Sequence, residues 1–246
     1  MSGTGELGTG LDSAALSDAE FDRALVASAF ALIAERGFGR FSVPAAARLG
    51  GLPLDRARAR FSGRHAVLLR FGRIADEAAL ARGSEEGSVR DRLFESVMRR
   101  LDVLQAHRAG VLALLRALPF EPMTALLLAR ATFRSMGWLL EAAGVSAAGP
   151  FGRLRAKGLL GVWLWTVAAW QRDESSDLSA TMAALDRALT RAGSAANWLP
   201  GSETTAAAPP DADGTSPPDV TSPPPPEPPS GELGPPWAGP PPDAPA

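Results

Sequence analysis

Residues 17–51 read SDAEFDRALVASAFALIAERGFGRFSVPAAARLGG, a pattern that predicts a long helix followed by a short one. Ser17 and Glu20 have the spacing of a capping box, in which a hydroxyl and a carboxylate satisfy the free backbone N–H groups of a helix start. Apolar residues then recur every three or four positions until Gly37, which is a natural helix end. Ser42 is suited to cap a second helix over 45–49, which two glycines close.

The next two segments complete a helix-turn-helix arrangement. A short helical segment covers 53–61, a turn follows at Ser62 and Gly63, and a longer amphipathic helix runs over about 64–82. A long helix, a short helix, a turn, a second short helix and another long helix, in this order, are typical of such a domain. Between Phe21 and Arg82 eleven arginines outnumber five acids, so this part carries a net charge of about +6 that is suited to phosphates.

The chain up to residue 199 continues in helical patterns. Ser88 and Asp91 start a helix with an apolar side, and its other side is expected to face solvent: Arg92, Glu95, Arg99, Arg100 and Asp102. Further helices are predicted over 111–118, 123–143, 150–171 and 178–191. No segment shows the sustained alternation of a strand. We therefore predict an all-α fold, with a three-helix helix-turn-helix domain over 17–82 and a C-terminal helical bundle over 83–199.

Proline is concentrated at the C-terminus, where 16 of the 22 prolines lie in the last 46 residues. That segment also holds seven of the 27 acids and no basic residue, so the remaining 20 acids face 25 basic residues and the rest of the chain is basic. Its composition offers little apolar surface to bury. We predict disorder for residues 200–246, an acidic Pro-rich tail, and for the Gly- and Ser-rich residues 1–16.

The composition argues against several kinds of chemistry. Without cysteine there is no disulfide, thiolate metal site or thiol nucleophile, and His65 and His107 lack the spacing of metal ligands. We expect no metal, no cofactor and no enzymatic activity. The N-terminus lacks the pattern of a signal peptide, and the longest uncharged helical run, 158–171, is shorter than a membrane span. These features predict a cytoplasmic protein without a transmembrane segment.

The sequence from Phe21 to Leu69 resembles the N-terminal domain of the TetR family of transcriptional regulators. The matching marks are the Ala-Glu-Arg-Gly-Phe helix end at 34–38, the Ser-Val-x-x-x-Ala-x-x-x-Gly second helix, and Phe61 followed three residues later by a basic residue. The resemblance implies that the helix over 54–61 enters the major groove and that its end contacts phosphates. Candidate contacts to DNA or phosphate are Arg56, Arg58, Arg60 and Arg64. Pro53, Arg58 and Arg60 depart from the usual regulator pattern, and Asp55 is unfavourable beside phosphates.

The second half resembles the C-terminal domain of the ubiquinone (coenzyme Q) biosynthesis auxiliary protein family, over VRDRLFESVMRRLDVLQAHRAGVLALLRALP (89–119), RSMGWLLEAAG (134–144) and residues 154–189. That family has a TetR-like fold, binds lipids and assists the diiron hydroxylase of the quinone pathway. The resemblance implies an isoprenoid or quinone-like lipid and that hydroxylase as partners. It also implies a surface that meets the hydroxylase, for which Met136 and Trp138 are the candidates; a buried core position for Trp138 is the alternative.

The helices over 123–143 and 150–171 are apolar beyond one face, which predicts a core helix, a dimer face or a ligand cavity. Candidate walls of an apolar lipid or ligand pocket are Leu126, Phe133, Leu159, Val162, Trp163, Thr166 and Trp170. TetR-fold proteins commonly form homodimers through their last two long helices, here 150–171 and 178–191. The short segment 192–199 stands where eukaryotic relatives carry a membrane-docking helix, so peripheral contact with the inner membrane stays an option.

Two hypotheses follow from these observations. The first is a non-catalytic, lipid-binding accessory protein of ubiquinone biosynthesis that presents substrate to a partner hydroxylase. The second is a TetR-type transcriptional repressor whose apolar pocket senses a small molecule and whose helix-turn-helix binds DNA. The arginines of residues 21–82 distinguish the hypotheses: they contact DNA in the second, and otherwise they form a solvated surface or contact anionic lipid headgroups.

Overall fold

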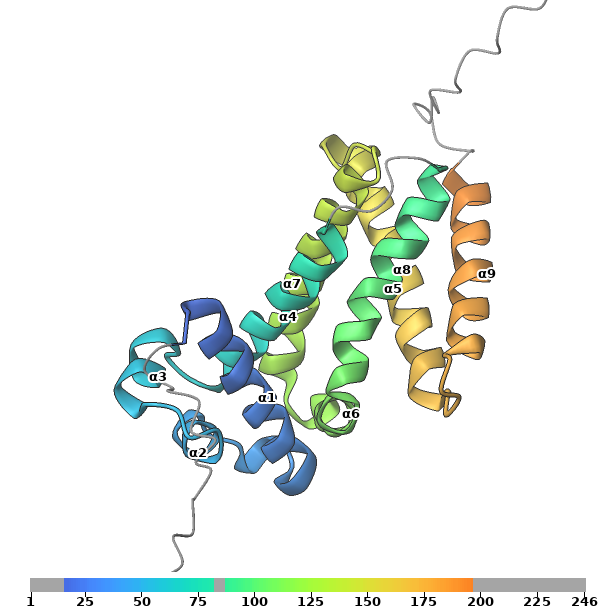
Figure 1. Ribbon diagram of the computed structural model, residues 1–246. Coiled ribbons are helices and arrows are strands. Elements are labelled where there is room, and N and C mark those ends of the chain that lie inside the picture. The colour runs from blue at the N-terminus through green and yellow to red at the C-terminus, as the bar shows by residue number, and fades with distance from the viewer. Residues whose placement is uncertain (1–15, 82–86, 197–246) are drawn as a thin grey trace, which may run out of the picture. The chain divides into compact units, whose positions relative to one another are not determined.

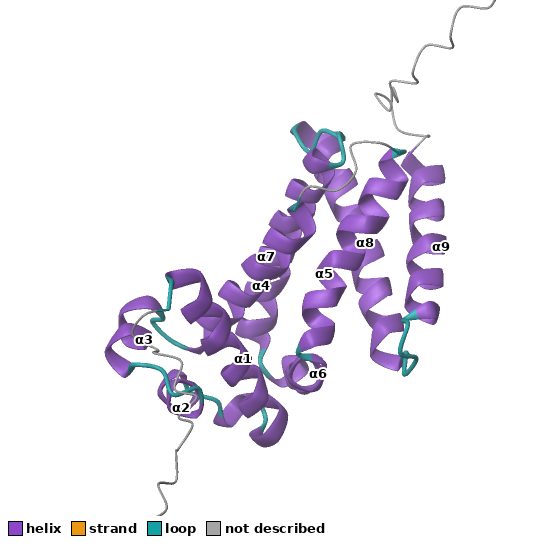
Figure 2. Cartoon of the chain, in the orientation of Figure 1, coloured by secondary structure: helices purple, strands orange, loops and turns teal. Residues whose placement is uncertain are grey.

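The structure, a computed structural model, describes residues 16–81 and 87–196 as helices joined by short loops, with no strand in those ranges (Figures 1 and 2). The all-α prediction is thereby confirmed. The predicted disordered segments 1–16 and 200–246 lie outside the described residues, apart from Leu16, and so do the domain boundary near residue 82 and the end of segment 192–199.

The N-terminal elements are α1 (Asp18–Arg36), a 3₁₀ turn η1 (Phe38–Arg40), α2 (Val43–Leu49), α3 (Leu54–Arg60) and α4 (Arg64–Leu80). Local sequence explains their limits. Both hydrogen bonds of the capping box are present: the Ser17 hydroxyl accepts from the Glu20 N–H, and the Glu20 carboxylate accepts from the Ser17 N–H. Gly37 ends α1 with a φ of 78°, a conformation that favours glycine. The Ser42 hydroxyl accepts a hydrogen bond from the Ala45 N–H and so caps α2. The predicted helix-turn-helix order is confirmed.

The second set of helices comprises α5 (Val89–Ala106), α6 (Arg108–Ala117), the 3₁₀ turn η2 (Leu118–Phe120), α7 (Pro122–Ala142), α8 (Gly149–Arg172) and α9 (Ser179–Ala196). Ser88 and Asp91 form the expected capping box of α5. Helix α6 begins three residues earlier than predicted, because the single residue His107 turns the chain between α5 and α6.

The two sets of helices pack on each other. Helix α4 lies against α5 and α7, and α1 crosses α6, as Figure 1 shows. On the other side α8 packs between α7 and α9, and α9 also touches α5. One continuous core joins all these helices, with Phe21 and Phe30 of α1, Leu101 of α5 and Trp170 of α8 among its fully buried side chains. The junction between the predicted domains is therefore apolar and closely packed.

The crossing of α1 and α6 is unusually close. At Gly110 of α6 a Cβ atom would lie 2.3 Å from the carbonyl oxygen of Phe30. Backbone atoms cannot rotate away as a side-chain tip can, so the two helices can approach this closely only because residue 110 has no side chain.

Candidate functional site

The arginines of α3 are paired with carboxylates of α1. An Arg56 Nη donates to Asp18 Oδ1 at 2.8 Å, and the Arg60 guanidinium donates to both oxygens of Asp22 at 2.7 and 2.9 Å. Arg60 also lies 2.5 Å from Asp18. Two of the four predicted phosphate contacts are thus neutralised within the protein, which weakens the field that α3 presents to a polyanion.

Asp22 links three helices. Its carboxylate is buried, and besides Arg60 of α3 it accepts a hydrogen bond from Arg70 Nε of α4 at 2.8 Å. The hydrogen bond to Asp22 raises the pKa of the Arg60 guanidinium. On the rim of the same cluster, the hydrogen bond from Arg56 lowers the pKa of Asp18. Because a buried carboxylate needs such partners, this cluster serves to hold α3 on α1.

The other two candidate arginines behave differently. Arg58 is exposed, as is Asp55 at the start of α3. Arg64 stacks over the Phe38 ring, 4.8 Å from its centroid, and lies 3.4 Å from Glu121 at the start of α7. The four arginines therefore do not form one outward face, and Arg58 is the predicted contact for which no ion pair is seen within the described residues.

The predicted pocket residues lie mostly in the packed core. Five of them share the buried side of α8: Leu159, Val162, Trp163, Thr166 and Trp170. The Thr166 hydroxyl donates to the Val162 carbonyl at 2.8 Å, and the Trp170 indole N–H donates to Gln105 at 2.8 Å. Phe133 is half-buried, whereas Leu126 is 64% exposed and points away from this core. Neither of the two best-defined cavities in the described part of the chain is lined by any of the seven.

A buried charge lies in this core and was missed by the sequence reading. Arg100, expected on the solvated side of α5, is 4% exposed and forms an ion pair with Asp76 of α4. Its guanidinium lies over the Trp163 ring at 4.9 Å, and Ser135 of α7 donates to the same Asp76 at 2.6 Å. Burial lowers the pKa of Arg100 to about 10. The spacing indicates this burial, because position 100 follows Val97 by three residues and so lies on the same buried face of α5.

Helix α7 exposes an apolar surface. Trp138 is 68% exposed, as expected for a partner surface, but Met136 is fully buried and the prediction for Met136 is wrong. Two residues along a helix turn by about 200°, so both cannot face outward. We define the outer α7 face by the exposed residues Met123, Leu126, Arg130, Arg134 and Trp138, which recur at three or four residue spacing. Phe120, just before this face, is 86% exposed.

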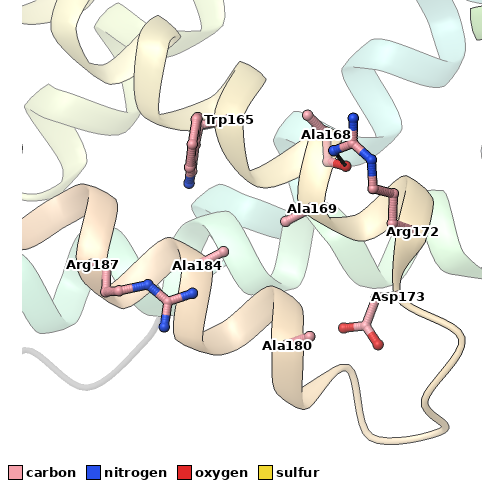
Figure 3. Close-up of a pocket in the computed structure, with 8 residues that line it drawn as sticks. All are labelled: Trp165, Ala168, Ala169, Arg172, Asp173, Ala180, Ala184 and Arg187. Atoms are coloured by element: carbon pink, nitrogen blue, oxygen red, sulfur yellow. Dashed lines mark hydrogen bonds between the residues drawn. The ribbon is translucent and has the colours of Figure 1, made fainter.

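Helices α8 and α9 carry a second exposed surface. A groove of about 300 Å³ lies between them, with Trp165 on one wall and Arg187 on the other (Figure 3). At its end Asp173 accepts hydrogen bonds from the N–H and hydroxyl of Thr181, both at 2.7 Å, which ties the end of α8 to α9. Hydrogen bonds from Ser175 and Thr181 lower the pKa of Asp173. Four of its eight lining residues are alanines, Ala168, Ala169, Ala180 and Ala184, so the groove has the character of a packing surface.

Both histidines have structural partners. His65 bonds to Thr124 through Nε2 at 3.0 Å, and His107 packs against the rings of Phe30 and Phe71. Partial burial lowers the pKa of His107. Within residues 16–81 and 87–196 no group of three or more potential ligands gathers in a way that could hold a metal ion.

The described helices are each too short or too polar to cross a membrane alone. One bent pair, Arg108–Phe120 with Pro122–Ala142, meets the criteria of length and composition only when its arms are joined across a bend of 118°.

Comparison with known proteins relates the chain to solved structures alone. No family model matches, and no curated protein matches. A TetR transcriptional regulator from Nitrosomonas europaea ATCC 19718 superposes with a TM-score of 0.59 at 21% identity, over 70% of this chain and 98% of that one. A putative TetR-family transcriptional regulator from Rhodococcus sp. gives a TM-score of 0.46 at 20% identity, over 68% and 98%. The first superposition, together with the helix order, shows that the chain has the TetR-like fold.

Proposed function

We propose that the protein is a non-catalytic accessory protein of ubiquinone biosynthesis, which binds an isoprenoid or quinone-like lipid and presents it to a hydroxylase. The observation that carries the proposal is the exposed outer α7 face around Trp138. Tryptophan, arginine and methionine are enriched at the centres of protein interfaces, and a bare Trp138 flanked by Arg134 matches that composition. This face is available for a partner without any rearrangement of the fold.

The state of α3 supports the same proposal. Arg56 and Arg60 bind α1 carboxylates, so α3 offers few free cations to a DNA groove. A protein that no longer binds DNA can retain the helix-turn-helix as a rigid support for the α5–α9 bundle.

The lipid site would lie between α7 and α8. Its wall would consist of the buried α8 residues Leu159, Val162 and Trp163, and α7 must separate from α8 for a lipid to enter.

We further propose that two copies pair through α8 and α9. Phe151, Leu154 and Trp165 of α8 are 45–57% exposed and lie on one side of the helix together with Gly158 and Gly161. A Cβ atom at either glycine would meet nothing within 4 Å. Apolar stripes with small residues let helices of two subunits approach closely. Light scattering on the full chain should give twice the mass of one chain; a single-chain mass at micromolar concentration would refute the dimer.

Ubiquinone profiling of a deletion strain tests the main proposal. We expect reduced ubiquinone in the deletion strain and restoration by the wild-type gene but not by Trp138→Ala, because losing a central interface tryptophan costs about 2 kcal/mol or more of binding free energy. Leu49→Ala is the matched control: Leu49 is also exposed, at 52%, but lies on α2. It should restore ubiquinone fully. Normal ubiquinone in the deletion strain would end the proposal.

A DNA-binding regulator is the second candidate, and the exposed Arg58 on α3 favours it. In this case the protein binds a palindromic operator in a salt-sensitive manner. Gel shifts at low salt with genomic fragments around its own gene should then show a complex that Arg58→Ala weakens by about tenfold, a loss typical of one charged contact. If no fragment shifts at low salt, this candidate is eliminated and the accessory role is unaffected.

A further inference from the structure

The larger of the two cavities lies between α2 and α3. It has a volume of about 650 Å³, and we call it the α2–α3 groove. Its walls come from the start of α2, one side of α3 and the turn that leads into α4, three segments that lie next to one another in Figure 1. Ligand sites of proteins commonly have volumes of about 300 to 1,000 Å³. The groove is therefore large enough for a small organic molecule.

The charged residues of the groove are all positive. Arg48 of α2, Arg58 of α3 and Arg64 of α4 line it, and no carboxylate does. Arg48 and Arg58 are exposed, and no ion pair is seen for either of them in the described part of the chain. They differ in this from Arg56 and Arg60, whose guanidinium groups bind Asp18 and Asp22. The Arg64 guanidinium is held by Glu121, so two guanidinium groups without an ion pair among the described residues border the groove, and they favour a negatively charged ligand.

The start of α4 adds hydrogen-bond donors to the same space. Gly63, the residue before α4, has no side chain to accept a hydrogen bond from the first backbone N–H groups of the helix. Ser62, Gly63 and Arg64 all line the groove, so this end of a 17-residue helix borders the same space as Arg48 and Arg58. Free N–H groups and the positive end of the helix dipole both favour a phosphate group.

The remaining wall of the groove is apolar. Val43, Pro44, Leu54 and Phe61 contribute to it, and Leu54 is 44% exposed. Val43 and Phe61 are already buried, so a bare inorganic ion, which is much smaller than the groove, would leave Pro44 and Leu54 in water. An apolar chain or ring attached to the phosphate would cover them and gain the free energy of burial.

We propose that the α2–α3 groove binds a phosphate or diphosphate ester that carries an apolar group. The phosphate contacts Arg48, Arg58 and the start of α4, and the apolar group lies on Pro44 and Leu54. The proposal goes beyond the accessory role and does not depend on it, because the groove and the outer α7 face share no residue. The phosphates of a DNA backbone have the same head-group chemistry, so the test must separate a small ester from a duplex.

Calorimetric titration of the full chain with dodecyl phosphate, below its micelle concentration, tests the proposal. We expect one site per chain, with inorganic phosphate alone and dodecanol alone each binding about tenfold more weakly or worse. The double variant Arg48→Gln/Arg58→Gln should also lose about tenfold or more in affinity. The matched control Arg116→Gln, an exposed arginine of α6, should bind as the wild type does.

Three results would overturn the proposal. Equal affinity for dodecanol would show that the phosphate is not recognised, and unchanged affinity in the double variant would place binding elsewhere. Displacement of dodecyl phosphate by a short DNA duplex at equal phosphate concentration would assign the groove to a nucleic-acid backbone instead. Circular dichroism of the double variant should match the wild type, since both arginines are exposed.

Discussion

Gly110→Ala is expected to lower the free energy of unfolding by about 3 kcal/mol, at the upper end of the range for overpacked cores. The added methyl group would lie 2.3 Å from the Phe30 carbonyl oxygen and 2.9 Å from its carbon atom, both in the backbone of α1. The clash can be relieved only if α6 moves away from α1 as a unit. That movement would loosen the neighbouring contacts of Val111 and Leu114, which are buried.

Urea unfolding followed by circular dichroism measures this effect. The matched control is Gly72→Ala in the middle of α4, where a Cβ atom would meet nothing within 4 Å. Because alanine favours a helix more than glycine does, the control should be neutral or more stable by up to about 1 kcal/mol. Equal stability of the two variants would show that α1 and α6 do not cross as closely as described.

Asp22→Ala is expected to cost about 3 kcal/mol, because removing one partner of a buried ion pair leaves charges without compensation. Asp22 is 4% exposed and binds Arg60 and Arg70 from two different helices. Arg60 keeps Asp18 and Arg70 keeps Glu77, so the loss should stay below that of an isolated buried pair. The main consequence should be a loosened α3.

Two measurements separate this effect from a general loss of stability. In urea unfolding, Asp18→Ala should cost much less than Asp22→Ala, because the Asp18 side chain is 67% exposed and its pairs are weakened by solvent. In limited proteolysis by trypsin under native conditions, Asp22→Ala should be cut faster within α3, at Arg56, Arg58 or Arg60. If both variants unfold at the same urea concentration and α3 resists trypsin, Asp22 does not hold α3 in place.

The elements of the fold could be predicted because their signals are local. The capping boxes at Ser17 and Ser88 and the glycine end of α1 depend on residues within one turn of each other. Apolar spacing likewise predicted the order of the described helices, with errors at their ends such as that at α6, where the single residue His107 turns the chain. Such patterns act through the backbone hydrogen bonds of a single segment.

The candidate sites were predicted less well, because they depend on what each helix face meets. Arg60 was predicted to contact phosphate, yet Asp22, 38 residues away, holds it. The predicted surface pair Met136 and Trp138 lies on opposite sides of α7. Arg100 lies on the buried face of α5, where Asp76 of another helix compensates its charge. No local pattern reveals a partner that comes from a distant segment.

The sequence alone determined the secondary structure, the order of its helices and the basic character of its N-terminal part. Only the tertiary structure decided which arginines remain free, since pairing with a carboxylate requires two helices to meet in a given register. It also decided that the outer α7 face stays exposed while five predicted pocket residues are buried. The spacing of apolar residues shows that α7 and α8 are apolar on more than one face. Only the packing of the neighbouring helices determines which of these faces is buried.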